Sequence, residues 1–230
     1  MYRPSIVLFA GLLLGACENE IQYSGFDMDD FFPVDGTERG WVMDNMDTSE
    51  QYVLDIAFLG EPEVVDGDVE VFTFDASRRC IEGVEECGAG PAFSYGMSVE
   101  PLDGIRLHHY SVDGADPVVF DTPMVLAKDK MARGDTVTTD NVDGHSFTVT
   151  FVDLERELDD DGQPTELAPE LGCDQTLRVN WECAHLKVES TPAGHWLAGD
   201  WWAAAGYNVV AFKRTNDSGK WRTIDVSYTE

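Results

Sequence analysis

Basic side chains are scarce in this chain, which has 15 Lys and Arg against 44 Asp and Glu and a formal net charge of −29. Nucleic-acid binding draws much of its affinity from Lys and Arg contacts with phosphate, so this balance argues against a nucleic-acid partner. It also argues against a domain that lies flat on anionic lipid. The acidity fits a salt-adapted or cation-attracting surface, or a solvated surface that keeps the protein in solution.

Long hydrophobic runs are missing as well. The apolar stretch from Ile6 to Ala16 has 11 residues, whereas a helix needs about 20 to cross a bilayer. Arg3 precedes the stretch, and a short apolar run behind a basic residue is typical of a secretory signal peptide. The sequence therefore predicts export of the chain.

Four residues at the end of this run indicate how the exported chain is held. Leu14-Gly15-Ala16-Cys17 resembles the lipobox of bacterial lipoproteins, where small residues give the signal peptidase access to the bond before a modified thiol. The resemblance implies that residues 1–16 are a signal peptide and that Cys17 becomes the lipid-carrying first residue. Two or three acyl chains anchor firmly, because each buried methylene contributes about 0.8 kcal/mol. The alternative is an ordinary secreted protein that loses Cys17.

The resemblance also implies a compartment. We expect a lipid-anchored protein of the cell envelope, in the outer membrane rather than the inner one. Its folded part would lie in the periplasm or at the cell surface.

Only five cysteines are present, and removing Cys17 leaves the even set Cys80, Cys87, Cys173 and Cys183. An oxidising compartment permits disulfides, and four cysteines allow three pairings. We favour the two local pairs, Cys80–Cys87 and Cys173–Cys183, each of which would stabilise the fold by about 2–3 kcal/mol. A zinc site is the alternative. Its cysteines usually lie two to four residues apart, whereas six and nine residues intervene here.

No stretch of 12 or more residues shows the helical period of 3.6. Short segments rich in Val, Ile, Phe, Tyr, Trp and Thr recur instead, several with the alternation of a half-buried strand. Only Met124–Met131 and Trp201–Ala205 are expected to form a turn or so of helix. The strands are expected at Trp41–Met43, Tyr52–Phe58, Val69–Phe74, Ile105–Ser111, Ser146–Asp153, Leu177–Glu189, Gly206–Lys213 and Trp221–Tyr228.

Turn residues separate these segments at Asp66-Gly67, Asp113-Gly114, Asp143-Gly144 and Asp217-Ser218-Gly219. Asp-Gly favours tight hairpins, since both central positions of a type I′ turn need a positive φ. Strands joined by hairpins predict an all-β, antiparallel meander. The sheet is either a curved half-barrel or a sandwich.

The hydrophobic content of 43% is too high for a wholly disordered chain. We expect a lipidated acidic tether over residues 17–30 and a single β domain over residues 31–230. Within that domain, residues 154–172 form an acidic, proline-containing loop.

Short motifs resemble a group of uncharacterised β-rich bacterial envelope lipoproteins. They are an aromatic-Pro segment ending in glycine, Phe32–Gly36, then Trp41, and later Thr191–Trp196 and Gly206–Val210. Asn208 stands where these proteins carry a second glycine, and asparagine tolerates the left-handed backbone region. The resemblance implies the fold and brings no activity.

The motifs of common hydrolases are absent: the chain has neither Gly-x-Ser-x-Gly nor His-Glu-x-x-His. His108 and His109 are neighbours in an expected strand, so we predict that they point to opposite faces. We expect His145, His185 and His195, like that pair, to be surface or packed residues rather than ligands. A triad is recognised by geometry, so one assembled in space stays open.

Calcium is the one cofactor that the sequence offers. Glu157, Asp159 and Asp161 place carboxylates at alternate positions before Gly162, as in the first half of an EF-type loop. The twelfth position is Ala168 rather than the usual bidentate glutamate. A solvated acidic loop is the alternative.

Trp201 and Trp202 form a candidate ligand-binding pair, close to Trp196 and Tyr207. Exposed indoles would suit sugar stacking, whereas buried ones are ordinary core. Since neighbours in a strand face opposite ways, we expect one of the pair to be exposed.

Together these features predict an envelope lipoprotein that works as a non-enzymatic binding or interaction module. Its partner would be a protein, a glycan or an apolar ligand inside the curved sheet. An envelope hydrolase is the alternative. A deep apolar cavity on the concave face would favour ligand carriage, and a cleft with a histidine, a carboxylate and a serine would favour catalysis.

Overall fold

The computed structural model describes residues 26–32, 34, 39–45, 47–48, 50–81, 90–100, 103–156, 182–206, 208–215, 219 and 221–227. These residues form strands and one short 3₁₀ helix. The elements are β1 (Phe26–Asp27), η1 (Asp29–Phe31), β2 (Arg39–Asn45), β3 (Gln51–Phe58), β4 (Glu63–Val65), β5 (Val69–Arg79), β6 (Gly90–Glu100), β7 (Gly104–Val112), β8 (Val118–Ala127), β9 (Lys130–Met131), β10 (Thr136–Val142), β11 (His145–Arg156), β12 (Glu182–Thr191), β13 (Gly199–Ala204), β14 (Asn208–Arg214) and β15 (Trp221–Ser227).

Thirteen of the described strands form one antiparallel sheet, in the order β10-β11-β12-β13-β14-β15-β2-β3-β5-β6-β7-β8, with β4 paired to β5. Most neighbours in the sheet are also neighbours in sequence, as in a meander. The prediction of an all-β antiparallel fold is therefore confirmed.

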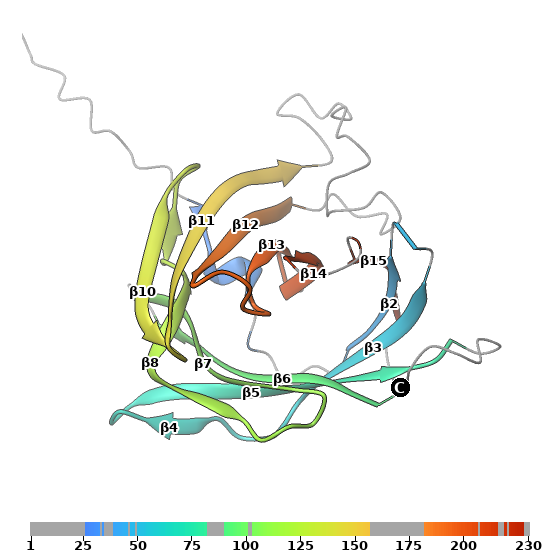
Figure 1. Ribbon diagram of the computed structural model, residues 1–230, viewed down its shortest axis with the longest axis horizontal. Coiled ribbons are helices and arrows are strands. Elements are labelled where there is room, and N and C mark those ends of the chain that lie inside the picture. The colour runs from blue at the N-terminus through green and yellow to red at the C-terminus, as the bar shows by residue number, and fades with distance from the viewer. Residues whose placement is uncertain are drawn as a thin grey trace, which may run out of the picture.

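The sheet curls until its two halves face one another, with β11 to β14 opposite β3, β5 and β6 (Figure 1). Its end strands, β8 and β10, lie side by side, and the N–H of Val125 donates to Oγ1 of Thr139 at 3.1 Å. No ladder joins these two strands among the described residues, so the sheet is not closed into a barrel. The curl creates an interior that a flat sheet would not have.

Three of the predicted turns have the expected geometry. The φ angles are 47° and 100° at Asp66-Gly67, 51° and 72° at Asp113-Gly114, and 49° and 72° at Asp143-Gly144. Both residues of each pair are thus left-handed, as a type I′ turn requires. Only Asp143-Gly144 joins its strands as a two-residue hairpin, with Val142 paired to His145, whereas three residues separate the paired Val65 and Val69. Asn208, with φ 67°, adopts the left-handed conformation expected of it. The Asp217-Ser218-Gly219 turn falls largely outside the described residues.

The two predicted helical turns are wrong. Met124–Ala127 is the end of β8, Lys130–Met131 is β9, and Trp201–Ala205 belongs mostly to β13. Both segments are short apolar runs, for which sequence period does not separate helix from strand. Cross-strand partners decide the matter, since Trp201 and Trp202 pair with Leu186 and His185 of β12.

The folded part begins earlier than residue 31. Phe26 and Asp27 pair with β9, and the N–H of Met28 donates to the carbonyl of Asp129 at 2.9 Å. Met28 and Phe31 are 0% and 4% exposed and pack into the main core. The end of the predicted tether is therefore part of the domain, because these apolar side chains fill the interior.

Several sequence predictions lie outside the described residues. They include the signal peptide, Cys17, most of the acidic loop, and the start of the strand expected at residue 177. Cys80 and Cys183 are each disulfide-bonded. Their expected partners, Cys87 and Cys173, also lie outside, so the two pairings stay predictions.

Candidate functional site: the cavity inside the curled sheet

The interior of the curled sheet contains a cavity with an apolar wall. Except for Asn208 and Arg214, its described lining residues are aliphatic, aromatic or methionine. The apolar members are Phe32, Trp41, Met43, Leu54, Ile56, Phe93, Tyr95, Met97, Leu107, Tyr110, Leu126, Leu186, Val188, Trp196, Leu197, Trp201, Val209 and Phe212.

The wall consists of apolar side chains at every second position of the strands. Phe93, Tyr95 and Met97 are alternate residues of β6, and all three face the cavity. Leu186 and Val188 do the same on β12 from the opposite half of the curl. Alternate residues point to one face of a strand, so apolar side chains at these positions make an apolar concave surface.

The cavity leaves about 80 Å³ for the centres of water-sized molecules. One water needs about 10–15 Å³ on that measure, and an apolar cavity stays dry. The space therefore suits part of an apolar molecule better than a cluster of waters. The lining is also of the kind that small-molecule sites share, which is mostly hydrophobic with few polar groups.

The structure separates the two candidate tryptophans. Trp201 lines the cavity, and its Nε1–H donates to the carbonyl of Leu197 at 3.0 Å. Trp202 is 5% exposed and does not line the cavity; its ring stacks on His185 with centroids 4.5 Å apart. The expectation of one exposed indole is wrong, because His185 and the neighbouring core cover Trp202.

A polar cluster adjoins the wall at Tyr110. The Tyr110 hydroxyl donates to Oδ2 of Asp143 at 3.2 Å and lies 3.1 Å from Nε2 of His195. Asp143 is the first central residue of the type I′ turn between Val142 and His145, so the turn geometry places its carboxylate here. His195 is 8% exposed, and its ring packs edge-on against Phe147 at 4.9 Å.

The tautomer of His195 follows from these bonds. Its Nδ1 accepts the backbone N–H of Leu197 at 3.2 Å, so the proton sits on Nε2 and is donated to Tyr110. Burial, with a smaller effect of His145, lowers the pKa of His195 and keeps it neutral at pH 7. Neither ring nitrogen is then available as a general base, and the cluster serves to fix the loop after β12.

His108 and His109 point to the same face of the sheet, which corrects the prediction. His108 is an extra residue in β7, since Met97 pairs with Leu107 and Gly96 with His109. His108 lies 2.8 Å from Oγ of Ser98, and the His109 ring covers Gly96. Those two β6 residues are two apart and share a face. At a β-bulge, the side chains of two adjacent residues can point to the same face of the sheet.

Ser98, His108 and Glu100 form a serine-histidine-carboxylate group with the wrong order for catalysis. The Ser98 hydroxyl donates to Oε1 of Glu100 at 3.2 Å, so His108 Nε2 is the donor to Ser98. A catalytic triad needs the imidazole between the hydroxyl and the carboxylate. Ser98 is also 0% exposed. The described residues therefore offer no triad at this place.

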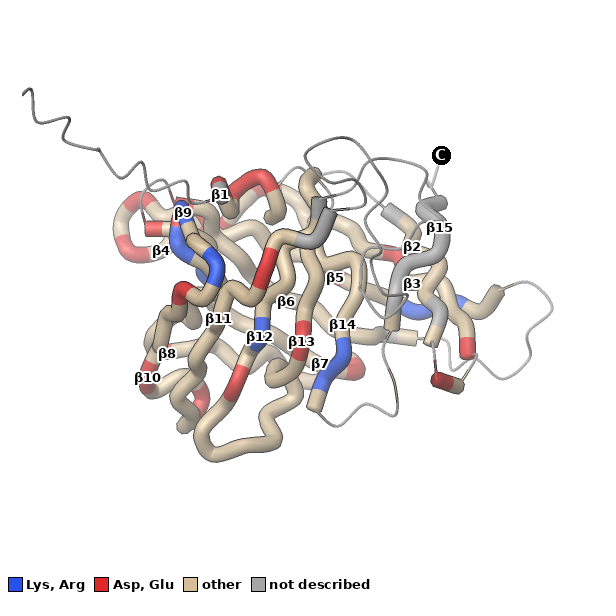
Figure 2. Tube along the Cα trace, turned by 90° about the horizontal axis from the view of Figure 1, so that it is seen from above, with Lys and Arg blue, Asp and Glu red and all other residues tan. Residues whose placement is uncertain are grey.

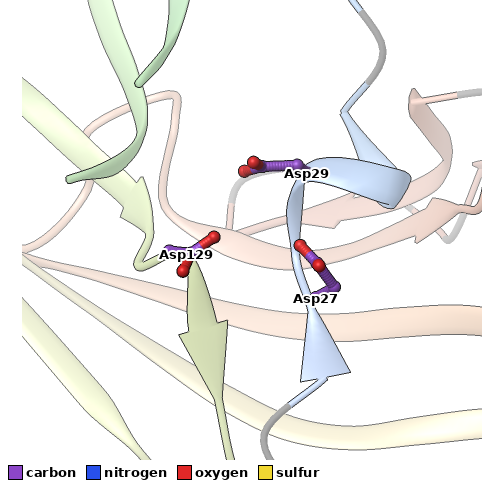
Figure 3. A group of neighbouring side chains, drawn as sticks. All are labelled: Asp27, Asp29 and Asp129. Atoms are coloured by element: carbon purple, nitrogen blue, oxygen red, sulfur yellow. The ribbon is translucent and has the colours of Figure 1, made fainter. Parts of the chain in front are cut away.

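Three carboxylates converge where β1 meets β9, as Figure 3 shows. Oxygens of Asp27, Asp29 and Asp129 all lie within 4.8 Å of one another, the only such cluster of three found in the described part of the chain. Burial and the neighbouring charges of Asp129, Asp27 and Asp30 raise the pKa of Asp29. Carboxylates suit a hard cation, but acidic clusters are common without one, and we assign no ion.

The sequence did not single out these three residues. The calcium ligands predicted from the sequence, Glu157, Asp159 and Asp161, lie outside the described residues. That prediction therefore stays open. Among the described residues, the candidate site is the cavity. The sequence predicts it only indirectly, because a cavity forms only if the expected sheet is curved.

No protein-family model, curated protein or solved structure matches this chain. The resemblance to envelope lipoproteins therefore stays a prediction based on short motifs. Within the described residues, no helix has both the length and the hydropathy needed to span a bilayer.

Proposed function

We propose that this protein is a binding module that takes an apolar ligand into the interior of its curled sheet. We further propose that a lipid on Cys17 holds it in the cell envelope. The observation that carries the first proposal is the apolar cavity between the two halves of the sheet. An empty space in the core costs packing energy, about 24 cal/mol for each Å³ in a studied series, and a ligand would recover it.

A binding role fits the described polar groups better than the alternative of a hydrolase. His195 is held as an Nε2–H donor, and Ser98 is buried in an order unsuited to nucleophilic attack. His185 lies 2.9 Å from Asp200 and stacks on Trp202 away from the cavity. Glycan binding on exposed tryptophans loses support too, since neither Trp201 nor Trp202 is exposed.

The proposal is tested with N-phenylnaphthylamine, an uncharged apolar fluorophore that brightens when it leaves water. We expect saturable binding to the purified chain. Val188→Phe, at a cavity-lining position 3% exposed, should weaken binding at least tenfold by filling the space. Overpacking of this kind costs about 1–3 kcal/mol of stability, so urea denaturation must show that the variant is folded.

Val119→Phe is the matched control, because it makes the same substitution at a side chain that is 72% exposed. It should leave the affinity unchanged. Absence of saturable binding by the natural chain, or equal affinity of the Val188→Phe variant, would contradict the proposal.

A further inference from the structure

We propose that His195 makes one wall of the cavity sensitive to acid, so that the protein binds its apolar ligand at neutral pH and releases it at acidic pH. The effect on binding rests on the proposed function and adds its regulation. The inference follows from the position of loop 192–198, from the hydrogen bond that holds this loop, and from the groups that surround the His195 ring.

Loop 192–198 joins β12 to β13 and forms part of the cavity wall. Trp196 and Leu197 belong to this loop, and both line the cavity. The loop contains no Lys, Arg, Asp or Glu, and Figure 2 shows it in tan between the two strands. His195 is therefore the one side chain of the loop that can acquire a charge between about pH 8 and pH 5.

The backbone of Leu197 is held by two hydrogen bonds. Its N–H donates to Nδ1 of His195 at 3.2 Å, and its carbonyl accepts the Nε1–H of Trp201 at 3.0 Å. The first bond needs a lone pair on Nδ1, whereas both ring nitrogens of a protonated histidine are donors. Protonation of His195 would therefore set two donors against each other. The bond that positions the wall residue Leu197 would then be lost.

The groups around His195 decide how readily its ring takes up a proton. His195 is 8% exposed, and burial is the main cause that lowers its pKa. Positive charge on His145 acts in the same direction, while the Asp143 carboxylate, 3.7 Å from Nε2, opposes it. Among the described residues, the ring faces the titratable groups of Tyr110, Asp143 and His145, and the uncharged side chains of Phe147 and Ser190.

The direction of the pH dependence follows from a comparison of two positions of the loop. In the closed position, which the structure shows, the pKa of His195 lies below its usual value of 6.5. In an open position, where water reaches the ring, the pKa returns to that value. The closed position is therefore fully favoured above pH 6.5 and loses stability as the pH falls from 6.5 to the closed-state pKa. Since opening binds one proton, affinity falls by at most about tenfold per pH unit.

The test measures the affinity of the purified full chain for N-phenylnaphthylamine, a probe whose charge does not change between pH 8 and pH 5. We expect saturable binding at pH 8 and an affinity about threefold to thirtyfold lower at pH 5. His195→Asn should still bind at pH 8 and lose the pH dependence, because its Oδ1 can accept the Leu197 N–H and does not titrate. His109→Asn is the matched control, since it removes a half-buried histidine that does not line the cavity. It should keep the pH dependence.

Two further variants change the charge beside His195 in opposite ways, and they decide if His195→Asn does not fold. His145→Gln removes a positive charge, so protonation of the closed position becomes easier and the loss of affinity at pH 5 should shrink. Asp143→Asn removes a negative charge, so the loss should grow. Asparagine suits this position, where φ is 49°.

Hydrogen exchange at the Leu197 amide measures the loop in the ligand-free chain. Its protection factor should fall between pH 8 and pH 5 in the natural chain and stay constant in His195→Asn. A constant affinity, undiminished protection of Leu197, or an equal pH dependence in His195→Asn would overturn the inference and leave the proposed function standing. Failure of the probe to bind at pH 8 would refute the proposed function, and the exchange of Leu197 would then decide whether acid opens the loop.

Discussion

Replacing Gly96 with alanine tests the arrangement around His109 on the outer face of the sheet. Gly96 pairs with His109, and a Cβ at Gly96 would overlap three atoms of the His109 ring. The ring must move, which breaks its 3.3 Å hydrogen bond with Oγ1 of Thr73. A neutral hydrogen bond contributes about 1 kcal/mol and overpacking costs about 1–3 kcal/mol. We therefore expect Gly96→Ala to lower the free energy of unfolding by about 2–4 kcal/mol.

The same substitution should be tolerated once the ring is removed. The three nearest atoms to the new Cβ all belong to the His109 side chain, so a His109→Ala background removes these three overlaps. Alanine is also favoured over glycine inside a strand by about 0.5–1 kcal/mol. Gly96→Ala should then be neutral or slightly stabilising. The difference between the two backgrounds is the coupling energy of the pair.

Urea denaturation at pH 7, followed by circular dichroism, measures the four free energies of this cycle. An equal cost of Gly96→Ala in both backgrounds would refute the reasoning. The His109 ring would then not lie over Gly96, and the shared face of His108 and His109 would lose its support.

Two further predictions concern the acidic cluster and the lipid anchor. The pKa of Asp29 is raised in the folded state, so ionisation of Asp29 opposes folding. This cost is absent below the usual pKa of 3.8 and grows as the pH rises from 3.8 through the folded-state pKa. Asp29→Asn should raise the melting midpoint modestly at pH 7, and this gain should vanish below about pH 3.8. The control Asp116→Asn, at an exposed position, should leave the midpoint unchanged at both pH values. A gain in Asp29→Asn that persists at low pH would contradict this account. For the lipid anchor, Cys17→Ala should abolish labelling by a palmitate analogue and release the chain from the membrane fraction. Undiminished labelling of this variant would contradict the proposed lipidation.

Local chemistry made much of the fold predictable. A type I′ turn requires a positive φ at both central positions, and Asp-Gly tolerates it there, so the turns could be predicted from two adjacent residues alone. Segments such as Tyr52–Phe58 and Val69–Phe74 were recognised as strands because β-branched and aromatic residues fit a half-buried sheet. The apolar run Met124–Met131 lacked such a distinctive pattern, so only its pairing partners could assign it to strands.

Two errors in the candidate site have physical causes. The opposite orientation predicted for His108 and His109 assumed strict alternation, and a bulge set by pairing with β6 removes it. The exposure predicted for Trp201 or Trp202 assumed that one face of β13 is open to water. Because the sheet curls, one face of β13 lines the cavity, which takes up Trp201. On the other face, the ring of His185 covers Trp202. Neither effect is visible in a single segment.

The sequence by itself determined the acidic character of the chain, its all-β class, and the positions of the tight turns. Each of these depends on composition or on residues adjacent in the chain, so no long-range contact is needed to establish it. Only the tertiary structure decided that an apolar cavity lies within the sheet and that Arg214 is its one described cation. The lining brings together side chains from Phe32 to Arg214, and their meeting depends on how strands far apart in sequence pair and curl.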